Sequence, residues 1–409
     1  MSEGRTAVVT GIGTVSAAGF EIEGTRTAFE RGGAERCLID RTAGYHLDRS
    51  ARTGFRVDDA ILKPLLDTKA ARRMCRPSKF AVAAAGRAMD HAALTGQAPR
   101  LAAVIVSTAF GPSMVTEQLV RQILLEGPEA ASPALFTESV ANAPAAQIAL
   151  ALGARGANIT ITQRQAGPLL AVARGSREVL AGRAEVALVG TVDEVTPLLH
   201  AILDRFRALA RPHGSQIEES RPFDGHRDGS ILGEGSTMLA IESEDGARRR
   251  GAPVLARVRT AGRAFDPTAP PTGWSRESGL LADAVRRDLE TNGVPLESID
   301  GIVSGACGSR GGDRIEALVL RNVWGSLTLP AIYTPKAYLG DHGGAVLAGA
   351  VLALSGTRFA ATPGFEEPDP ELSVRPHDGR THAPPSNVLV LSLATGGAGA
   401  WIVLDRASV

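Results

Sequence analysis

One residue that could take part in chemistry is Gln165, which lies where a β-branched run gives way to a helical pattern. Residues 159–175 read ITITQRQAGPLLAVARG. A strand, a tight turn at 165–167 and a helix would hold a reactive side chain at a helix N-terminus, where backbone N–H groups can receive a developing oxyanion. Serine or cysteine in that turn would be a nucleophile. Glutamine has no ionisable donor atom, so this pattern predicts a catalytic scaffold without a nucleophile.

Other candidate residues lie farther along the chain, and each also has a structural interpretation. Cys307 carries a thiol, but a buried cysteine most often acts as a small apolar side chain. Lys336 is expected to neutralise a buried acid, either Asp341 or Glu316. His342 directly follows Asp341, and we expect the two to form a remnant hydrogen-bonded pair.

Metal and cofactor sites are not indicated by the sequence. No spacing of cysteine and histidine is typical of a zinc site. The GxG at 11–13 is weak support for a dinucleotide site, because no acidic ribose partner follows on a second strand end. We therefore expect neither a metal nor a cofactor. Four histidines lie in loop-like segments and are expected to be solvated: His213, His226, His377 and His382.

Charge, cysteine content and hydropathy exclude several classes of partner. Lysine and arginine number 44 and so do the acids, so bulk charge indicates no nucleic acid partner. Three cysteines in 409 residues form no disulfide framework, which favours a reducing compartment. The longest apolar run, near 344–355, is too short to span a bilayer, and the N-terminus runs into a strand without a secretory signal. We expect a cytoplasmic protein without a membrane partner.

The elements that must position these residues alternate along the chain as in an α/β protein. Strands are expected at 6–10, 103–107, 158–162, 186–190 and 237–242, and helices at 69–95, 114–125, 143–152, 167–181 and 196–209. The order then begins again, with strands at 254–261, 301–304, 331–334, 388–393 and 400–404, and helices at 279–291, 313–323 and 344–354. This alternation predicts mostly parallel sheet, and its repetition predicts two similar halves at 1–250 and 251–409. A Pro-rich acidic segment at 364–385 is expected to be an exposed excursion.

Several motifs in order make the chain resemble the β-ketoacyl synthase family over nearly its whole length. They are VVTGIGTVSAAG at 8–19, ARRMCRPSKFAVAAAGRAM at 71–89, RPFDGHRDGSILGEGS at 221–236, GSRGGDRIEA at 308–317, KAYLGDHGGA at 336–345 and ATGGAGA at 394–400. The third is the most specific, since it is close to the family's PFD…RDG…GEG signature. The resemblance implies an α/β protein with the duplicated thiolase fold, layered α-β-α-β-α with two mixed sheets.

The same resemblance implies that the family's catalytic positions are replaced in this chain. The nucleophilic Cys aligns with Gln165, the first His with Cys307 and the second His with Asp341. The Phe that acts as a gate in the final glycine-rich loop aligns with Thr395, and only Lys336 is retained. A carboxylate at the second His position would repel a developing enolate. The chain is therefore expected not to condense acyl groups alone.

This pattern resembles the chain length factor, or ketosynthase-β, subunit of type II polyketide synthases, in which Gln in place of Cys recurs. The resemblance implies a heterodimer with an active ketosynthase (ketosynthase-α), transient contact with acyl carrier protein, and an acyl tunnel at the interface. Three alternatives stay open. One is a decarboxylase that uses Gln165 to make a primer from malonyl carrier protein, and another is an acyltransferase that uses Cys307. The third is a homodimeric binding protein without a synthase partner.

By the same resemblance, the segment STAFGPSMVTE at 107–117 lines the far end of the tunnel near the dimer interface. Phe110 and Met114 are four residues apart and would share one face of a helix. We predict that one of them caps the tunnel, with ordinary core packing as the alternative. The segment at 132–147 carries Glu138 as its single charge, as expected for a permanent interface.

Overall fold

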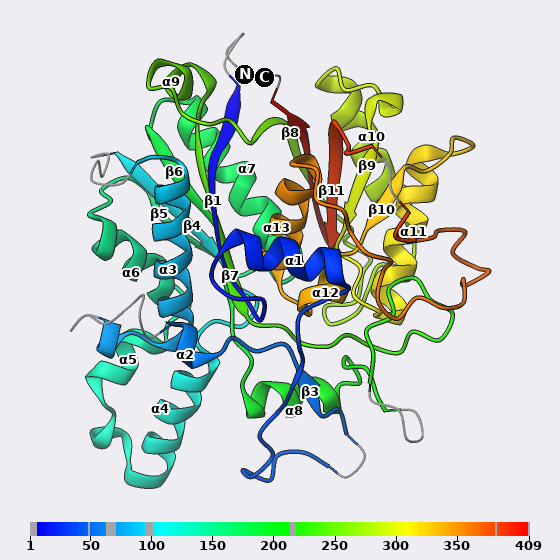
Figure 1. The fold of residues 1–409 in the computed structure, drawn as a ribbon. Coiled ribbons are helices and arrows are strands. Elements are labelled where there is room, and N and C mark those ends of the chain that lie inside the picture. The colour runs from blue at the N-terminus through cyan, green and yellow to red at the C-terminus, as the bar shows by residue number, and fades with distance from the viewer. Residues whose placement is uncertain are drawn as a thin grey trace.

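The computed structural model describes residues 6–47, 50–62, 71–94, 101–212, 218–380 and 383–407. His213, His382 and both ends of the helix expected at 69–95 lie outside the described residues. Figure 1 shows two sheet regions side by side with helices between and around them. Within the described residues, no helix combines the length and the apolar character needed to cross a bilayer.

The main sheet has ten strands within the described residues, five from each half of the chain. The first five are β1 (Ala7–Val15), β4 (Ala102–Ser107), β5 (Asn158–Ile161), β6 (Val186–Asp193) and β7 (Gly235–Ser243), and the last five are β8 (Ala256–Phe265), β9 (Gly301–Ser304), β10 (Ala331–Tyr333), β11 (Asn387–Leu393) and β12 (Ala398–Arg406). Their spatial order is β10-β9-β11-β12-β8-β1-β7-β6-β4-β5. Counted within each half, both sets follow the order 3-2-4-5-1, and in both the fifth strand is antiparallel to its neighbours.

The thiolase-like fold is therefore confirmed, and the two mixed sheets we expected meet edge to edge. Strands β1 and β8 pair antiparallel from Ala7↔Val258 to Val9↔Ala256, which joins the two sets into one hydrogen-bonded sheet. A division of the chain between residues 250 and 251 stays a prediction.

The helices complete the layers that we expected. Helices α3 (Arg76–His91) and α6 (Ala143–Leu152) cover the outer face of the first five strands, and α10 (Gly279–Thr291) and α11 (Arg310–Trp324) cover that of the last five. Between the two sheet regions lie α7 (Gly167–Leu180) and α13 (Gly343–Leu354), which contact both (Figure 1). Every residue of α13 is buried, as expected for a helix enclosed on all sides.

Shorter elements surround this core. Helix α4 (Ser113–Glu126) extends one residue beyond each expected end, and α8 (Pro197–Arg205) is shorter than the helix expected at 196–209. Elements without an expected counterpart are α1 (Ile22–Arg31), β2 (Cys37–Leu38), β3 (Thr53–Gly54), α2 (Asp59–Leu62), α5 (Pro133–Ser139), α9 (Glu244–Arg249) and α12 (Lys336–Leu339). Figure 1 shows α4 and α5 projecting away from the sheet.

The GxG at 11–13 lies inside β1 and not in a turn. A Cβ on Gly11 would collide with the backbone oxygen of Ala88, and one on Gly13 with that of Ala84. Both clashes are with α3, so the two glycines allow that helix to pack closely on the sheet. Close packing therefore explains the motif without a cofactor.

The segment at 364–385 is only partly exposed, contrary to our expectation. Leu372 and Val374 are buried in the apolar cluster beneath α10 and α11. The His377 N–H donates to the backbone oxygen of Ile332 in β10 at 2.7 Å. Because an edge strand presents unpaired backbone groups, the segment protects this end of the sheet.

Candidate functional site

The predicted site residues gather where the two central helices begin. Gln165 lies two residues before α7, and Asp341 lies two residues before α13. A Cβ on Gly343, the first residue of α13, would collide with the ring of Pro168 in the first turn of α7. The strand–turn–helix connections of the two halves therefore meet at one place.

Gln165 lies in the expected turn between β5 and α7. The Gly167 N–H donates to the backbone oxygen of Gln163 at 2.6 Å, which closes the turn. The Ser392 hydroxyl donates to the backbone oxygen of Gln165 at 2.8 Å and fixes the turn to β11. The side-chain Oε1 of Gln165 is buried and has no hydrogen-bond partner among the described residues.

Lys336 and Asp341 form an ion pair, with Nζ and Oδ1 2.7 Å apart. The lysine side chain is 1 % exposed and the aspartate side chain 17 %. Burial alone would raise the pKa of Asp341, but the Lys336 ammonium and hydrogen bonds from Lys336, Ser230 and Cys307 hold it below its usual value. Burial likewise opposes the charged lysine, yet Asp341 raises its pKa above the usual value. The aspartate is therefore an ionised acceptor whose charge is already neutralised.

Cys307 is buried in the loop between β9 and α11, as expected. Its backbone N–H donates to Asp313 Oδ1 at 3.1 Å, and its carbonyl accepts the Ser220 hydroxyl at 2.8 Å. Burial, followed by the negative charge of Asp341, raises the pKa of the thiol well above its usual value. Because the thiolate is the nucleophilic form, Cys307 has little reactivity at neutral pH.

His342 does not pair with Asp341, so that prediction is wrong. Both ring nitrogens of His342 are buried without a hydrogen-bond partner among the described residues. As the N-cap residue, His342 has extended backbone, so it follows Asp341 in sequence without sharing its contacts. Burial and then the Lys336 charge lower the pKa of His342 to about 4, which keeps the imidazole neutral.

Three buried or partly buried acids complete the site, of which the sequence singled out only Glu316. Glu316 accepts the Ser304 hydroxyl at 2.5 Å and the Gly305 N–H at 2.8 Å, and burial raises its pKa to about 7. Asp313, one turn earlier on α11, accepts three backbone N–H groups, and burial raises its pKa to about 6. Asp193 at the end of β6 accepts the Ala109 N–H at 2.8 Å. The i,i+3 spacing of the two α11 acids in GSRGGDRIEA was the available sequence signal for Asp313.

Thr395 and Phe110 meet at Arg164, a residue that the sequence did not single out. Arg164 Nη1 donates to Thr395 Oγ1 at 2.8 Å, and its guanidinium carbon lies 5.7 Å from the centroid of the Phe110 ring. Phe110 is 42 % exposed and lies in a bend before α4. Gly111, with φ of +67°, separates it from Met114 in the first turn of α4. The two residues therefore do not share a helix face as we predicted, because the left-handed glycine turns the chain between them.

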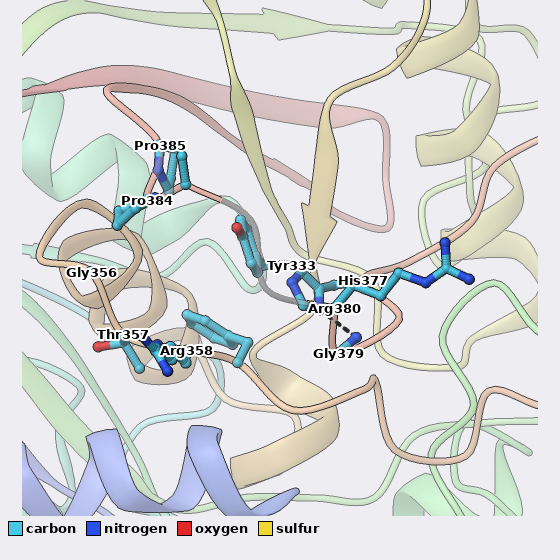
Figure 2. A pocket seen from close by; sticks show the side chains of 11 residues that line it. Tyr333, Gly356, Thr357, Arg358, His377, Gly379, Arg380, Pro384 and Pro385 are labelled. Carbon is cyan, nitrogen blue, oxygen red and sulfur yellow. Dashed lines mark hydrogen bonds between the residues drawn. The ribbon is translucent and has the colours of Figure 1, made fainter.

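A cavity of about 400 Å³ lies elsewhere, between the end of β10 and the segments that follow α13. Figure 2 shows Tyr333 and His377 side by side in its wall, with ring centroids 5.0 Å apart. The lining contains none of the residues predicted for the site. Among the described residues, no three His, Cys, Asp or Glu side chains are grouped so as to hold a metal ion.

Comparison with known proteins shows the family. The family model described as the N-terminal domain of β-ketoacyl synthase matches residues 8–247, more than half of the chain. The chain therefore belongs to the β-ketoacyl synthase family. It is 29% identical over 321 residues to the putative polyketide β-ketoacyl synthase 1 of Streptomyces virginiae, with 75% of each chain covered. It is 28% identical over 393 residues to 3-oxoacyl-[acyl-carrier-protein] synthase 2 of Synechocystis sp., with 93% of each covered.

Solved structures agree with this assignment. A chain of the ishigamide ketosynthase/chain length factor superposes with a TM-score of 0.88 at 29% identity, covering 99% of this chain and 100% of that one. A chain of a type II polyketide synthase complex, in which an acyl carrier protein is bound to its ketosynthase, has a TM-score of 0.87 at 20% identity and covers 98% and 100%. The second likeness shows the fold.

Proposed function

We propose that this chain is a non-condensing ketosynthase-like subunit. It pairs with an active ketosynthase and shapes the path of an acyl chain carried by acyl carrier protein. The observation that carries the proposal is the Lys336–Asp341 ion pair at 2.7 Å. At the position aligned with the family's second histidine, the site presents a neutralised carboxylate where condensation needs a hydrogen-bond donor to an enolate oxygen.

The other aligned positions support the same conclusion. Gln165 supplies no nucleophile, and the Cys307 thiol is buried with a raised pKa. His342 is neutral and could donate a hydrogen bond, but it caps α13 one residue beyond the aligned position. The site therefore retains the scaffold of a condensing enzyme without its proton and acyl chemistry.

The outer edge of β5 is consistent with the proposed pairing with a second subunit. Among the described residues, β5 is the last strand of the sheet and pairs only with β4. The backbone oxygens of Ala157 and Ile161 accept from the β4 side, so the alternate residues Asn158 and Thr160 direct their backbone groups outward. A free strand edge of this kind is suited to pairing with a strand of another subunit.

Apolar side chains on the projecting helices offer a second contact surface. Helices α4 and α5 and the residue after α5 expose Val120, Leu124, Leu125, Phe136 and Val140, each by more than a third. Apolar and aromatic side chains of this kind are typical of the core of a protein interface. The ketosynthase/chain length factor structure that this chain resembles is itself named for such a pair. Phe110 and Met114 lie beside this surface, and their role in limiting chain length stays part of the proposal.

Reconstitution tests the function. The purified chain, alone and co-expressed with an active ketosynthase, would be supplied with acyl and malonyl carrier protein. We expect condensation only in the complex, and a change in product length when Phe110 or Met114 is replaced by alanine. If the chain alone extends an acyl thioester, the proposal is wrong.

A decarboxylase is the second candidate, and the unpartnered Oε1 of Gln165 favours it. An amide oxygen without an internal partner is available to accept a hydrogen bond from a bound malonyl thioester of the carrier protein. Incubation with malonyl carrier protein separates the two functions, because the decarboxylase would release carbon dioxide and lose this activity in Gln165→Ala. An acyltransferase that uses Cys307 would instead show an acyl adduct on that residue by mass spectrometry.

A further inference from the structure

Three segments that are distant in sequence meet at the Arg164 side chain. Arg164 belongs to the turn before α7, Thr395 to the glycine-rich loop between β11 and β12, and Phe110 to the bend between β4 and α4. The hydrogen bond to Thr395 Oγ1 measures 2.8 Å, and the guanidinium lies over the Phe110 ring at 5.7 Å. One exposed cation therefore links the segments that surround the Gln165 turn.

Arg164 is exposed, but the two residues that follow it lead directly into the protein interior. Arg164 is exposed, whereas the next residue, Gln165, carries a buried Oε1, and Ala166 after it is fully buried. No ion pair to Arg164 is found among the described residues, so its contacts are a hydroxyl and an aromatic face. A guanidinium can hold both at once, since it is planar, donates in a fixed fork and stacks on rings.

We propose that Arg164 closes the entrance to the Gln165 site of this subunit, so that an acyl thioester reaches only the site of the partner. In this role the side chain holds the Gln165 turn to the glycine-rich loop through its hydrogen bond to Thr395, and its guanidinium lies against the Phe110 ring. Arg164 is a specificity-determining residue in this role. The exclusion of the thioester in favour of the partner rests on the proposed function, whereas the closure itself does not.

A thiol placed at residue 165 measures access directly. The purified chain carrying Gln165→Cys would be treated with iodoacetamide, and mass spectrometry would follow modification of the peptide that contains residue 165, separately from Cys37. We expect the rate to rise about ten-fold when Arg164→Ala is added, because the hydrogen bond from a charged donor that keeps the entrance closed is then absent. Thr395→Val, which removes the acceptor and keeps the volume, should give a smaller rise.

The direction of the change excludes an electrostatic explanation. Removing a neighbouring cation raises the pKa of a thiol and so lowers its reactivity at a given pH. A faster reaction in the Arg164→Ala variant therefore reports access, and a pH profile of the rate would confirm that the thiol pKa has not fallen.

The matched control is Arg155→Ala in the same Gln165→Cys chain, because Arg155 is an exposed arginine that precedes β5, whereas Arg164 follows it. Its rate should equal that of Gln165→Cys alone. Equal or slower modification in the Arg164→Ala variant would overturn the closure. Because the measurement needs neither a ketosynthase nor a carrier protein, failure of the proposed function would leave this result standing.

Discussion

In the N-terminal half, β5 leads through residues 162–166 into α7, and in the C-terminal half β10 leads through residues 334–342 into α13. The two connections occupy equivalent places in the repeated strand order but have opposite character. The first carries an uncharged Gln165 with an unpartnered oxygen, and the second carries the Lys336–Asp341 ion pair. The comparison shows that one connection carries an uncharged side chain whose oxygen has no partner among the described residues, while the other carries two charges that satisfy each other.

The outer edges of the same two strands differ as well. Strand β10 is covered, since the His377 N–H bonds to Ile332, whereas no strand among the described residues pairs with the outer side of β5. The segment at 364–385 that covers β10 has no counterpart after α7. Thus one end of the sheet is covered by the chain's own segment, and the other end has no strand paired to it among the described residues.

The largest expected effect is loss of the complex when a backbone N–H on the unpaired edge of β5 is removed. Thr160→Pro removes an outward N–H without breaking the β4–β5 ladder, so a strand from a partner could no longer pair there. We expect the variant to fail to co-purify with a co-expressed active ketosynthase. Thr160→Val keeps the N–H and should co-purify normally. If the proline variant still co-purifies, the β5 edge does not pair with a partner strand, and in this respect it does not differ from the covered edge of β10.

Breaking the ion pair of the second connection should cost stability. Lys336→Met leaves Asp341 partly buried and uncompensated, and removal of one partner of such a pair typically costs about 3–5 kcal/mol. Urea denaturation would measure the change in the free energy of unfolding. The double variant with Asp341→Leu should recover most of the loss, because both charges are then absent. A double variant as unstable as the single one would contradict a neutralised pair.

Glu316 should make the free energy of unfolding depend on pH. Its pKa rises from 4.5 to about 7 on folding, so its favourable contribution is complete below pH 4.5 and is lost as the pH rises through 7. We expect Glu316→Gln to become more stable than the unaltered chain over that interval, by up to roughly 3 kcal/mol. Denaturation at pH 5 and pH 8 checks the difference. His342 has the opposite dependence, but it is present in both proteins and cancels. If the difference in the free energy of unfolding between the two proteins were the same at pH 5 and pH 8, the raised pKa of Glu316 would be contradicted.

The smallest effect on the free energy of unfolding is expected from replacing Gln165 in the first connection. Gln165→Ala removes an oxygen that has no partner among the described residues, so the free energy of unfolding should change by less than about 1 kcal/mol. Thermal unfolding next to Lys336→Met makes the comparison direct. A loss as large as that of the lysine variant would mean that both connections are structural to the same degree.

Much of the fold could be predicted because it is encoded locally. Strand β9 and helices α6 and α10 have the expected bounds, since β-branched runs and helical periodicity report neighbouring residues. For the site, ordered motifs pointed to Gln165, Cys307, Asp341 and Thr395, and their assignment as vestigial active-site positions stays a prediction. What failed depends on contacts between distant segments. Arg164 matters only because Thr395 and Phe110 meet it in space, and a single left-handed glycine, Gly111, separates Phe110 from its expected helix.

The enclosed position of α13 also has a consequence for synthesis of the protein. Residues of β1, β6 and α7 are translated long before α13, yet their apolar side chains share one cluster with it. A nascent chain released at residue 250 would expose that surface to solvent. We expect the ribosome to deliver nearly the entire polypeptide before either half can finish folding, in contrast to proteins whose domains mature one after another.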